Sequence, residues 1–413
     1  MGDYLVRCVI DGSVHPSSAL VCQEHDSLLR THYSARRLEL RDMPGIWRFY
    51  DWLPVKGIIP EVCQGSVTYR SSDLGDELGL KNLYISFSGY WPERGARMPT
   101  CSFKDLEAAP TMQRLREHGQ GRPLVVASAG NTARAFADAA ARTGQRTVLF
   151  VPEGAVQRVW TSAEPANTVL VAVRGDYADA ISVADSVQRR TGLVPEGGAR
   201  NIARRDGMGT VMLEAAVRIG RMPEHYFQAI GSGTGGISAW EAAMRLVSDG
   251  RFGQHLPRLH LAQSLPNAPI YYAWSGREPG PYAQHAFDDV LFNRHPPYWI
   301  AGGVRDALSA TGGCVYGITD EEAWRAKRLF EECEGVDILR APAVAVAALE
   351  AAVRSGSVGA DDLVLLNITG GGEERLREEG VTNQVQPDGT VSGWQEALQL
   401  LEEMGGAWNH RRF

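Results

Sequence analysis

Short, continuously apolar runs alternate with amphipathic helical patterns along most of this chain, and this alternation constrains the fold more than any other feature. The runs predict buried strands at 84–88, 124–128, 147–151, 168–173, 226–230, 259–262 and 363–368. Helical spacing of apolar residues fills the intervals, for example over 208–219, where Gly220 ends the pattern. Strands that are apolar on both faces are typical of parallel sheets covered by helices, so the sequence predicts an α/β fold.

Charge and hydropathy exclude several classes of protein. The 413 residues carry 42 basic and 49 acidic side chains, which give a formal net charge of -7. This balance is unlike the basic surface of a nucleic-acid-binding protein, and no apolar run approaches the roughly 18 residues of a membrane span. The first residues lack the apolar core of a secretory signal. We expect a cytoplasmic protein with no nucleic-acid or membrane partner, and the length predicts two domains or one large α/β unit.

The six cysteines are far apart and include no CxxC pair. A disulfide framework is not expected in a chain of this length without a secretory signal. A zinc site built on Cys8 and Cys22 would need two further ligands, for which His15 and His25 are candidates. Because paired-ligand spacing is absent, the sequence predicts no metal site.

Four of the expected strands run into polar or glycine-rich segments, which begin after residues 88, 128, 230 and 368. Ligands of open parallel sheets bind beyond the carboxyl ends of the strands. We therefore expect these four segments to converge on one edge of a sheet and to form the functional site.

The segment after residue 230 reads GSGTGG and lies between an expected strand and an expected helix. Glycine amides and a helix N-terminus bind anions, and the two hydroxyls add donors. The spacing also satisfies G-x-G-x-x-G, the signature of a nucleotide-binding oxidoreductase, but that site needs an acidic residue where Gln263 and Ser264 stand. A single phosphate, such as that of pyridoxal phosphate (PLP), fits better. The predicted phosphate ligands are Gly231, Ser232, Gly233, Thr234, Gly235 and Gly236.

A PLP enzyme needs one lysine near the sheet edge, and the chain has only four lysines. Lys327 lies in a patterned helix, where we expect it on the solvated face. Lys81 and Lys56 lie in polar or irregular sequence. Lys104 alone lies in a strand-end segment beside a small hydroxyl residue and an aromatic one, in SFKD. The alternative is that Lys104 is an exposed helical residue paired with Glu107.

The segments after residues 128 and 368 carry further candidate ligands. Asn131 either caps the helix that it opens or lies beside the PLP ring and bonds its 3′-oxygen. The amides of the same loop would bind a substrate carboxylate, with Ser128, Ala129, Gly130 and Thr132 as its members. The hydroxyl of Thr369 can bond the ring nitrogen, and Thr382 is the alternative partner.

In this order, SFKD, AGNT, the glycine loop and a late strand ending in Thr-Gly resemble the fold-type II PLP enzymes, whose fold is that of the tryptophan synthase β chain. Threonine synthase is a broad relative, and the resemblance to the cysteate synthase family is closer. It is carried by FSGYWPERG (87–95), TCSFKDLEAAPTM (100–112), VPEGGARNIARRDGMGT (194–210) and GSGTGGISAWEA (231–242).

The resemblance implies two domains with mostly parallel sheets and the active site between them. We expect a large domain over 1–95 and 216–413 that carries the phosphate loop. A smaller domain over 96–215 would carry the asparagine loop and Lys104, which would hold PLP as a Schiff base.

The resemblance also implies a reaction. Sulfite would replace the phosphate of O-phospho-L-serine and give L-cysteate, which feeds coenzyme M biosynthesis in methanogenic archaea, while Lys104 would remove and return the Cα proton. Threonine synthase activity on O-phospho-L-homoserine is the alternative. A homo-oligomer is expected.

Both reacting anions require cations in the site. The candidates are arginines near Lys104 or in GGARNIARRDG, and we assign Arg97 and Arg204 to the substrate, with Arg94, Arg200 and Arg205 as further candidates. In the competing interpretation, Arg204 and Arg205 pair with Asp206 on an exposed turn.

Overall fold

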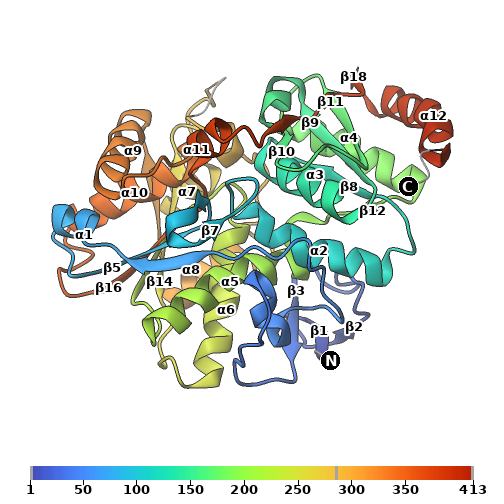
Figure 1. Cartoon of the computed structure of the whole chain (residues 1–413). Helices are drawn as coiled ribbons and strands as arrows, with labels where there is room; N and C mark the ends of the chain where they lie inside the picture. The colour runs from blue at the N-terminus through green and yellow to red at the C-terminus, as the bar shows by residue number, and fades with distance from the viewer. Residues whose placement is uncertain (1–2, 284–286, 411–413) are drawn as a thin grey trace. The chain divides into compact units, whose positions relative to one another are not determined.

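The computed structural model describes residues 3–283 and 287–410, which form two compact units (Figure 1). Unit 1 comprises Met1–Arg114 and Gly197–Gly380, and unit 2 comprises Leu115–Glu196 and Val381–Phe413. These boundaries differ from the expected ones, because 96–114 and 197–215 belong to unit 1 and the segment after Gly380 belongs to unit 2. The difference arises from long-range packing: the helix over 202–219 packs on the next helix of unit 1, and the strand over 389–391 pairs within unit 2.

Unit 1 is built on a six-stranded sheet in the order β15-β14-β13-β16-β5-β4. Five strands are parallel and β4 runs antiparallel at the edge. The strands are β4 (Val67–Arg70), β5 (Asn82–Phe87), β13 (His225–Ala229), β14 (Arg258–Ser264), β15 (Cys314–Ile318) and β16 (Leu363–Ile368). The central strand β16 is buried along its whole length, as its sequence LVLLNI predicts.

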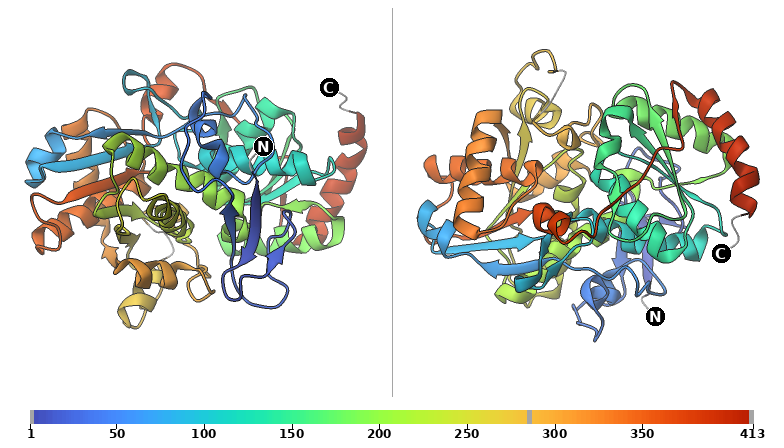
Figure 2. Two further views of the ribbon diagram at one scale, coloured as in Figure 1. Left: turned by 90° about the horizontal axis from the view of Figure 1, so that it is seen from below. Right: turned by 45° about the horizontal axis from the view of Figure 1, so that its top comes forward.

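Helices cover both faces of this sheet (Figure 2). One core cluster packs under α5 (Ile202–Ile219), α6 (Thr234–Asp249) and α8 (Val304–Thr311). A second cluster packs under α1 (Asp73–Leu78), α9 (Asp320–Glu334) and α10 (Arg340–Arg354). The sheet is therefore shielded from water on both sides, and its strand ends are the part left to bind ligands.

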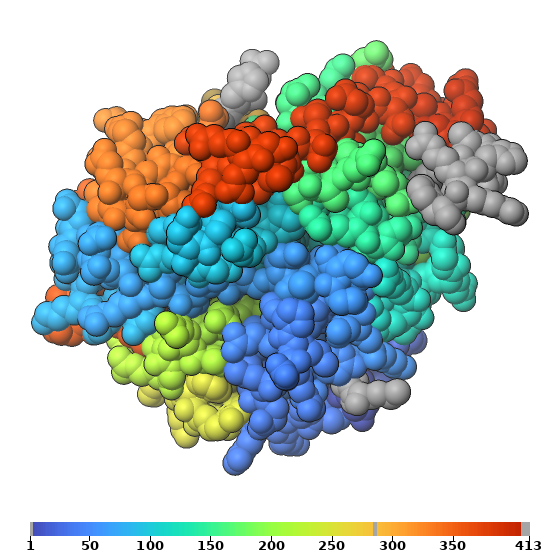
Figure 3. Space-filling model, viewed as in Figure 1, coloured from blue at the N-terminus to red at the C-terminus, as the bar shows by residue number. Residues whose placement is uncertain are grey.

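The N-terminal part of unit 1 forms a small antiparallel sheet in the order β2-β1-β3, which the sequence did not lead us to expect. It consists of β1 (Tyr4–Cys8), β2 (Val14–His15) and β3 (Leu29–Tyr33), and η1 (Gly45–Trp52) follows it. Its buried face packs on Ile202 at the start of α5. In the space-filling view this blue N-terminal segment lies at the surface (Figure 3).

Unit 2 contains a parallel sheet in the order β12-β8-β9-β11-β18. Its strands are β8 (Leu124–Ala127), β9 (Thr147–Pro152), β11 (Thr168–Val173), β12 (Val194–Pro195) and β18 (Gly389–Val391). The helices α4 (Tyr177–Thr191) and α12 (Trp394–His410) share a core cluster on this sheet, and α3 (Asn131–Thr143) packs on β8 and β9. A separate pair joins β10 (Trp160–Thr161) to β17 (Asn383–Gln384).

Short elements complete the chain. They are β6 (Tyr90–Trp91), η2 (Pro92–Arg94), β7 (Ala96–Arg97), α2 (Lys104–His118), η3 (Glu153–Arg158), η4 (Gly198–Arg200), α7 (Pro269–Ser275), η5 (Asp289–Leu291) and α11 (Glu373–Glu378). All seven strands expected from the apolar runs are present, within a few residues of the expected bounds. Over the described residues, every helix is too short or too polar to cross a bilayer.

Candidate active site

Three of the four polar strand-end segments meet at one edge of the unit 1 sheet. They follow β5, β13 and β16, and β16 lies between the other two. The expectation that the fourth segment shares this edge is wrong, because β8 pairs with β9 and β12 in the sheet of unit 2. The unit 1 edge therefore gathers the glycine loop, Lys104 and Thr369, whereas the asparagine loop belongs to unit 2.

Backbone pairing fixes Lys104 beside the end of β16. The amide of Phe103 donates to the carbonyl of Thr369 at 3.0 Å, and the amide of Gly371 donates to the carbonyl of Cys101 at 3.1 Å. Cys101 is fully buried and has a φ of 53°, a left-handed conformation that is uncommon outside glycine. Such strain is tolerated where the surrounding structure demands it, and here it turns the chain so that α2 begins at Lys104.

The amine of Lys104 lies in a largely buried group of charges. Its Nζ is 3.3 Å from Oε2 of Glu107, and the same oxygen is 3.0 Å from Nε of Arg204. The Lys104 side chain is 19% exposed and that of Glu107 is 0% exposed. The alternative of a lysine paired with Glu107 is thus correct about the partner but wrong about exposure, and the pair lies at the functional edge of the sheet.

The other three lysines are placed differently. Lys81 is exposed and pairs with Asp361 at 2.8 Å. Lys56 is exposed before the start of β4. Lys327 is half-buried and pairs with Glu331 on α9, so the expectation that it lies on the solvated face is wrong. Neither Lys81 nor Lys327 lies in a polar strand-end segment, so Lys104 stays the candidate for binding the cofactor.

The glycine loop joins β13 to the N-terminus of α6. Gly233 is the N-cap with a φ of 81°, and no side chain caps the helix. A Cβ at Gly233 would come within 3.0 Å of Cγ2 of Val304, and the positive φ also favours glycine there, whereas a Cβ at Gly235 would require the Gln228 side chain to shift. The Oγ of Ser232 lies 2.7 Å from that of Thr234. The amide of Thr234 donates to Oγ of Ser232 at 3.4 Å, and a helix N-terminus with two adjacent hydroxyls suits a phosphate group.

Two serines at this edge were not predicted from the sequence. Ser88 follows β5 directly and Ser264 ends β14, and both are buried. Within the described part of the chain, neither hydroxyl has a hydrogen-bond partner. Buried polar atoms are nearly always paired, so these two hydroxyls are available to a polar group that binds at the strand ends. The detectable signal was a hydroxyl residue at the end of an apolar strand.

In unit 2 the segment over 128–132 forms a tight turn between β8 and α3. Gly130 is the N-cap of α3 with a φ of 147°, which only glycine adopts readily, and its amide donates to Oγ of Ser128 at 3.1 Å. Asn131 is the first residue of the helix, so the alternative that it is the N-cap is wrong. Thr132 and Ala129 are buried in the same turn, and Thr382 is half-buried elsewhere in unit 2.

The arginines assigned to substrate have different surroundings. Arg97 is exposed on β7, in the hairpin that follows β5. Arg94 in the same hairpin stacks on Trp91, with its guanidinium carbon 4.7 Å from the ring centroid. Arg200 is more than a third exposed and pairs with Asp26 at 3.0 Å. Of this group, Arg97 presents its charge to solvent most freely.

Arg204 and Arg205 do not pair with Asp206 on an exposed turn, so that interpretation is wrong. All three residues are buried in the first turns of α5. Arg205 pairs with Glu241 at 2.9 Å, and Asp206 pairs instead with Arg245 at 2.7 Å. Arg205 therefore joins α5 to α6, whereas Arg204 faces the carboxylate beside Lys104.

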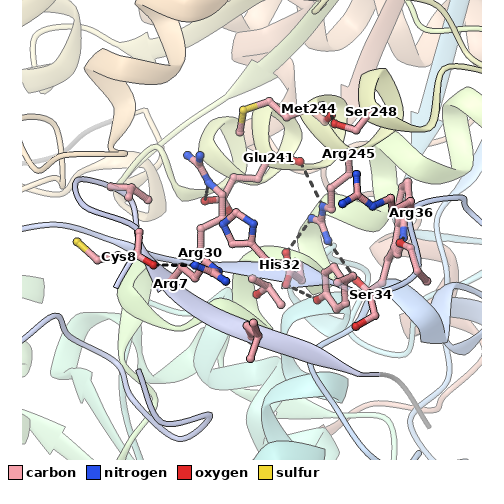
Figure 4. A pocket seen from close by; sticks show the side chains of 18 residues that line it. Arg7, Cys8, Arg30, His32, Ser34, Arg36, Glu241, Met244, Arg245 and Ser248 are labelled. Carbon is pink, nitrogen blue, oxygen red and sulfur yellow. Dashed lines mark hydrogen bonds and ion pairs between the residues drawn. The ribbon is translucent and has the colours of Figure 1, made fainter. Parts of the chain in front are cut away.

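A pocket of about 770 Å³ in unit 1 lies elsewhere, between the N-terminal sheet and α6 (Figure 4). None of the predicted site residues lines it. Arg30 and Glu241 pair across it at 3.1 Å. Burial would raise the pKa of Glu241, but the charges of Arg205 and Arg30 outweigh burial and hold that pKa below its ordinary value. The pocket therefore has a fixed charge pattern but no group suited to PLP chemistry.

Comparison with known proteins agrees with the geometry of the sheet edge. Residues 85–370 match the profile of the family described as pyridoxal-phosphate dependent enzyme. Cysteate synthase of Methanococcoides burtonii is 54% identical over 95% of this chain and 94% of its own length. Cysteate synthase of Methanothrix thermoacetophila is 54% identical over 98% of this chain and 100% of its own length.

Solved structures support the fold alone. A PLP-dependent aspartate racemase aligns with a TM-score of 0.58 at 15% identity, over 75% of this chain and 92% of its own. Maize serine racemase aligns with a TM-score of 0.57 at 16% identity, over 76% and 93% respectively. The expected fold class and cofactor are confirmed, and a nucleotide-binding oxidoreductase is not favoured. The chain belongs to the cysteate synthase family of pyridoxal-phosphate-dependent enzymes.

Proposed function

We propose that this enzyme replaces the phosphate of O-phospho-L-serine with sulfite and releases L-cysteate and inorganic phosphate. The carrying observation is that Lys104 lies at the end of β16, on the sheet edge that also carries the glycine loop, in a chain 54% identical to cysteate synthases over nearly its full length. In this reaction the Cβ–O bond breaks and a Cβ–S bond forms. The balance needs no oxidant or reductant, because sulfite brings its own electron pair.

The residues of unit 1 fit the cofactor. We assign the amides of 231–236 and the hydroxyls of Ser232 and Thr234 to its phosphate, because these donors lie at an uncapped helix N-terminus. Lys104 holds the cofactor through its amine. Thr369 is the preferred partner of the ring nitrogen over Thr382, because it lies in the same unit as Lys104 and the glycine loop. Asn131 of unit 2 is assigned to the 3′-oxygen.

When bound, PLP withdraws electrons from Cα of the amino acid and so makes loss of the Cα proton and of a β-substituent accessible. The chain supplies the proton transfers. Once the amino group of the substrate takes its place on the cofactor, the freed amine of Lys104 would remove the proton from Cα before phosphate leaves, and would protonate the same carbon after sulfite has added to Cβ. One proton is taken up and one is returned, so the two steps balance.

The remaining residues bind and orient the amino acid. The amides of 128–132 at the N-terminus of α3 hold its carboxylate. The phosphate that leaves and the sulfite that enters are both highly charged anions, so their site needs guanidinium groups. Arg97 is assigned to them because its charge is exposed. Arg204 is also assigned to the substrate. Its positive charge balances the negative charge of Glu107, which lies beside the amine of Lys104.

A substrate panel tests this proposal. Purified holoenzyme given O-phospho-L-serine and sulfite is expected to release phosphate and to form cysteate in equal amounts, identified by mass. O-phospho-L-homoserine is the matched control, because it differs by one methylene and is the substrate of the threonine synthase alternative. Phosphate release from phosphohomoserine but not from phosphoserine would overturn the assignment.

A variant pair ties the activity to the proposed residue. Lys104→Ala is expected to abolish cysteate formation, whereas Lys81→Ala removes an exposed lysine that precedes the N-terminal end of β5 and should leave turnover unchanged. If Lys104→Ala retains turnover, the role of Lys104 is contradicted, but the assignment of the substrates is unaffected.

A further inference from the structure

Three side chains with metal-binding atoms converge in the N-terminal part of unit 1, apart from the candidate active site. Cys8 ends β1, and Cys22 and His25 lie in the connection between β2 and β3. The two thiol sulfurs and a ring nitrogen of the histidine all lie within 4.8 Å of one another. Both cysteines are buried and the histidine is half-buried. Cys8 also lines the pocket between the N-terminal sheet and α6 (Figure 4).

The distances match the edges of a metal tetrahedron. Nδ1 of His25 is 3.6 Å from Sγ of Cys8 and 3.8 Å from Sγ of Cys22. Zinc binds thiolate at about 2.3 Å and imidazole at about 2.0–2.1 Å, so tetrahedral angles place sulfur and nitrogen about 3.5 Å apart. The two sulfur–nitrogen separations lie close to this value, and the two sulfurs are at most 4.8 Å apart. The same ring nitrogen faces both sulfurs, as ligation by one atom requires.

The surroundings of Cys8 favour the thiolate that a metal needs. Its sulfur lies 3.2 Å from Oγ of Ser27 and accepts from the amide of Ile10 at 3.4 Å. These two polar contacts suit a thiolate, which is the ligand form of cysteine.

A carboxylate lies beside the histidine, outside the group of three mutually close ligand atoms. Oδ2 of Asp11 is 3.8 Å from Nδ1 of His25. The amide and the hydroxyl of Ser13 both donate to Oδ1 of Asp11, at 3.0 Å and 2.7 Å, which leaves Oδ2 on the side of His25. His15, which the sequence offered as a ligand, instead lies 3.2 Å from Oγ of Ser13.

We propose that Cys8, Cys22 and His25 bind one zinc ion and that Asp11 completes its tetrahedral coordination. Two thiolates with an imidazole select zinc over the hard cations magnesium and calcium. The site is structural, because none of the residues assigned to PLP or substrate belongs to it. It ties the connection between β2 and β3 to the end of β1, and this segment packs on Ile202 at the start of α5.

Metal analysis of the PLP-loaded enzyme tests the proposal. Enzyme offered zinc and then dialysed is expected to keep one zinc per chain by elemental mass spectrometry. Cobalt replacement should give the intense visible bands of tetrahedral cobalt thiolate, which lie at longer wavelength than PLP absorbance. X-ray absorption should report two sulfur neighbours at about 2.3 Å.

Variants then locate the ion. Cys8→Ser, Cys22→Ser and His25→Gln should each lose the zinc, whereas Cys333→Ser, a half-buried cysteine of α9, is the matched control and should keep it. If the ligand variants fail to fold, the zinc content and cobalt spectrum of the unaltered enzyme still decide the proposal. Asp11→Asn should weaken zinc binding roughly 10- to 100-fold, and unchanged affinity would show water in the fourth position and overturn the role of Asp11.

Two results would overturn the proposal as a whole. One is an enzyme that retains no metal and keeps both thiols reactive, which would leave the cluster as a set of thiol hydrogen bonds. The other is a disulfide between Cys8 and Cys22, seen as a loss of two mass units that reductant reverses. Neither result bears on substrate turnover, so failure of the metal site is distinguishable from failure of the proposed reaction.

Discussion

The first turn of α6 offers a sharp test of the phosphate loop. Gly233 and Gly250 are the N-cap and C-cap of the same helix, and their φ angles are nearly equal at 81° and 80°. A Cβ at Gly250 would meet nothing within 4 Å, whereas one at Gly233 would overlap Cγ2 of Val304. Val304 is fully buried, so it has no open space into which to move.

The expected magnitudes follow from these surroundings. Alanine in a left-handed conformation costs about 1–2 kcal/mol, and this term applies to both positions. Overpacking a buried site adds about 1–3 kcal/mol, and this term applies to Gly233 alone. Gly233→Ala is therefore expected to lower the free energy of unfolding by about 2–5 kcal/mol and Gly250→Ala by about 1–2 kcal/mol.

The two variants should also differ in cofactor binding. Relief of the overlap at Gly233 must displace the amides assigned to the PLP phosphate, and a loss of about 1.4 kcal/mol weakens PLP binding tenfold. Urea unfolding of the apoenzyme and titration of each variant with PLP provide the two measurements. Equal stability losses and equal PLP affinities in Gly233→Ala and Gly250→Ala would refute the reasoning.

Three further predictions rest on single side chains. Glu107→Gln leaves Arg204 without its buried anion and should cost about 3 kcal/mol of stability, whereas the exposed control Asp361→Asn should cost less than about 1 kcal/mol in the same denaturant titration. Burial lowers the pKa of His260 to about 3. Below about pH 6.5 the unfolded chain therefore binds a proton that the folded chain does not, and the free energy of unfolding decreases as the pH is lowered. Between about pH 7 and pH 4 the stability of His260→Gln should fall about 3 kcal/mol less than that of the unaltered enzyme, and parallel pH profiles would contradict this. Asn131→Ala should weaken PLP binding without loss of stability above about 1 kcal/mol, because Asn131 is not the helix cap, and a large stability loss with unchanged PLP affinity would contradict its assignment.

Local sequence predicted the strands that are buried on both faces. The run LVLLNI became β16, and the spacing over 208–219 became the second half of α5, ended by Gly220. The half-buried β15 and the N-terminal sheet were missed, because partly exposed strands lack a continuous apolar run. The sequence also did not predict which strands belong to which sheet. Neighbouring strands such as β5 and β16 are far apart in the sequence, so local patterns do not reveal their pairing.

The residues of the candidate site likewise fall into those that local sequence motifs predict and those that only the packing of the elements reveals. Lys104, the glycine loop and Asn131 could be predicted as candidates because each lies in a short motif beside a strand or helix. The pairing of Glu107 with Arg204 and the unpartnered hydroxyl of Ser88 were not found, since both depend on which elements pack together. His25 lies near Cys8 because β1 pairs with β3, and the spacing of these residues in the sequence does not predict the contact.

The central claim is that Lys104 carries the cofactor, and reduction of the holoenzyme with borohydride tests it most directly. Borohydride fixes the carbon–nitrogen double bond between a lysine and PLP, so peptide mapping by mass spectrometry identifies the lysine that carried it. The chain offers only four lysines. We predict the pyridoxyl group on Lys104 alone, and its recovery on Lys56, Lys81 or Lys327 would contradict the account.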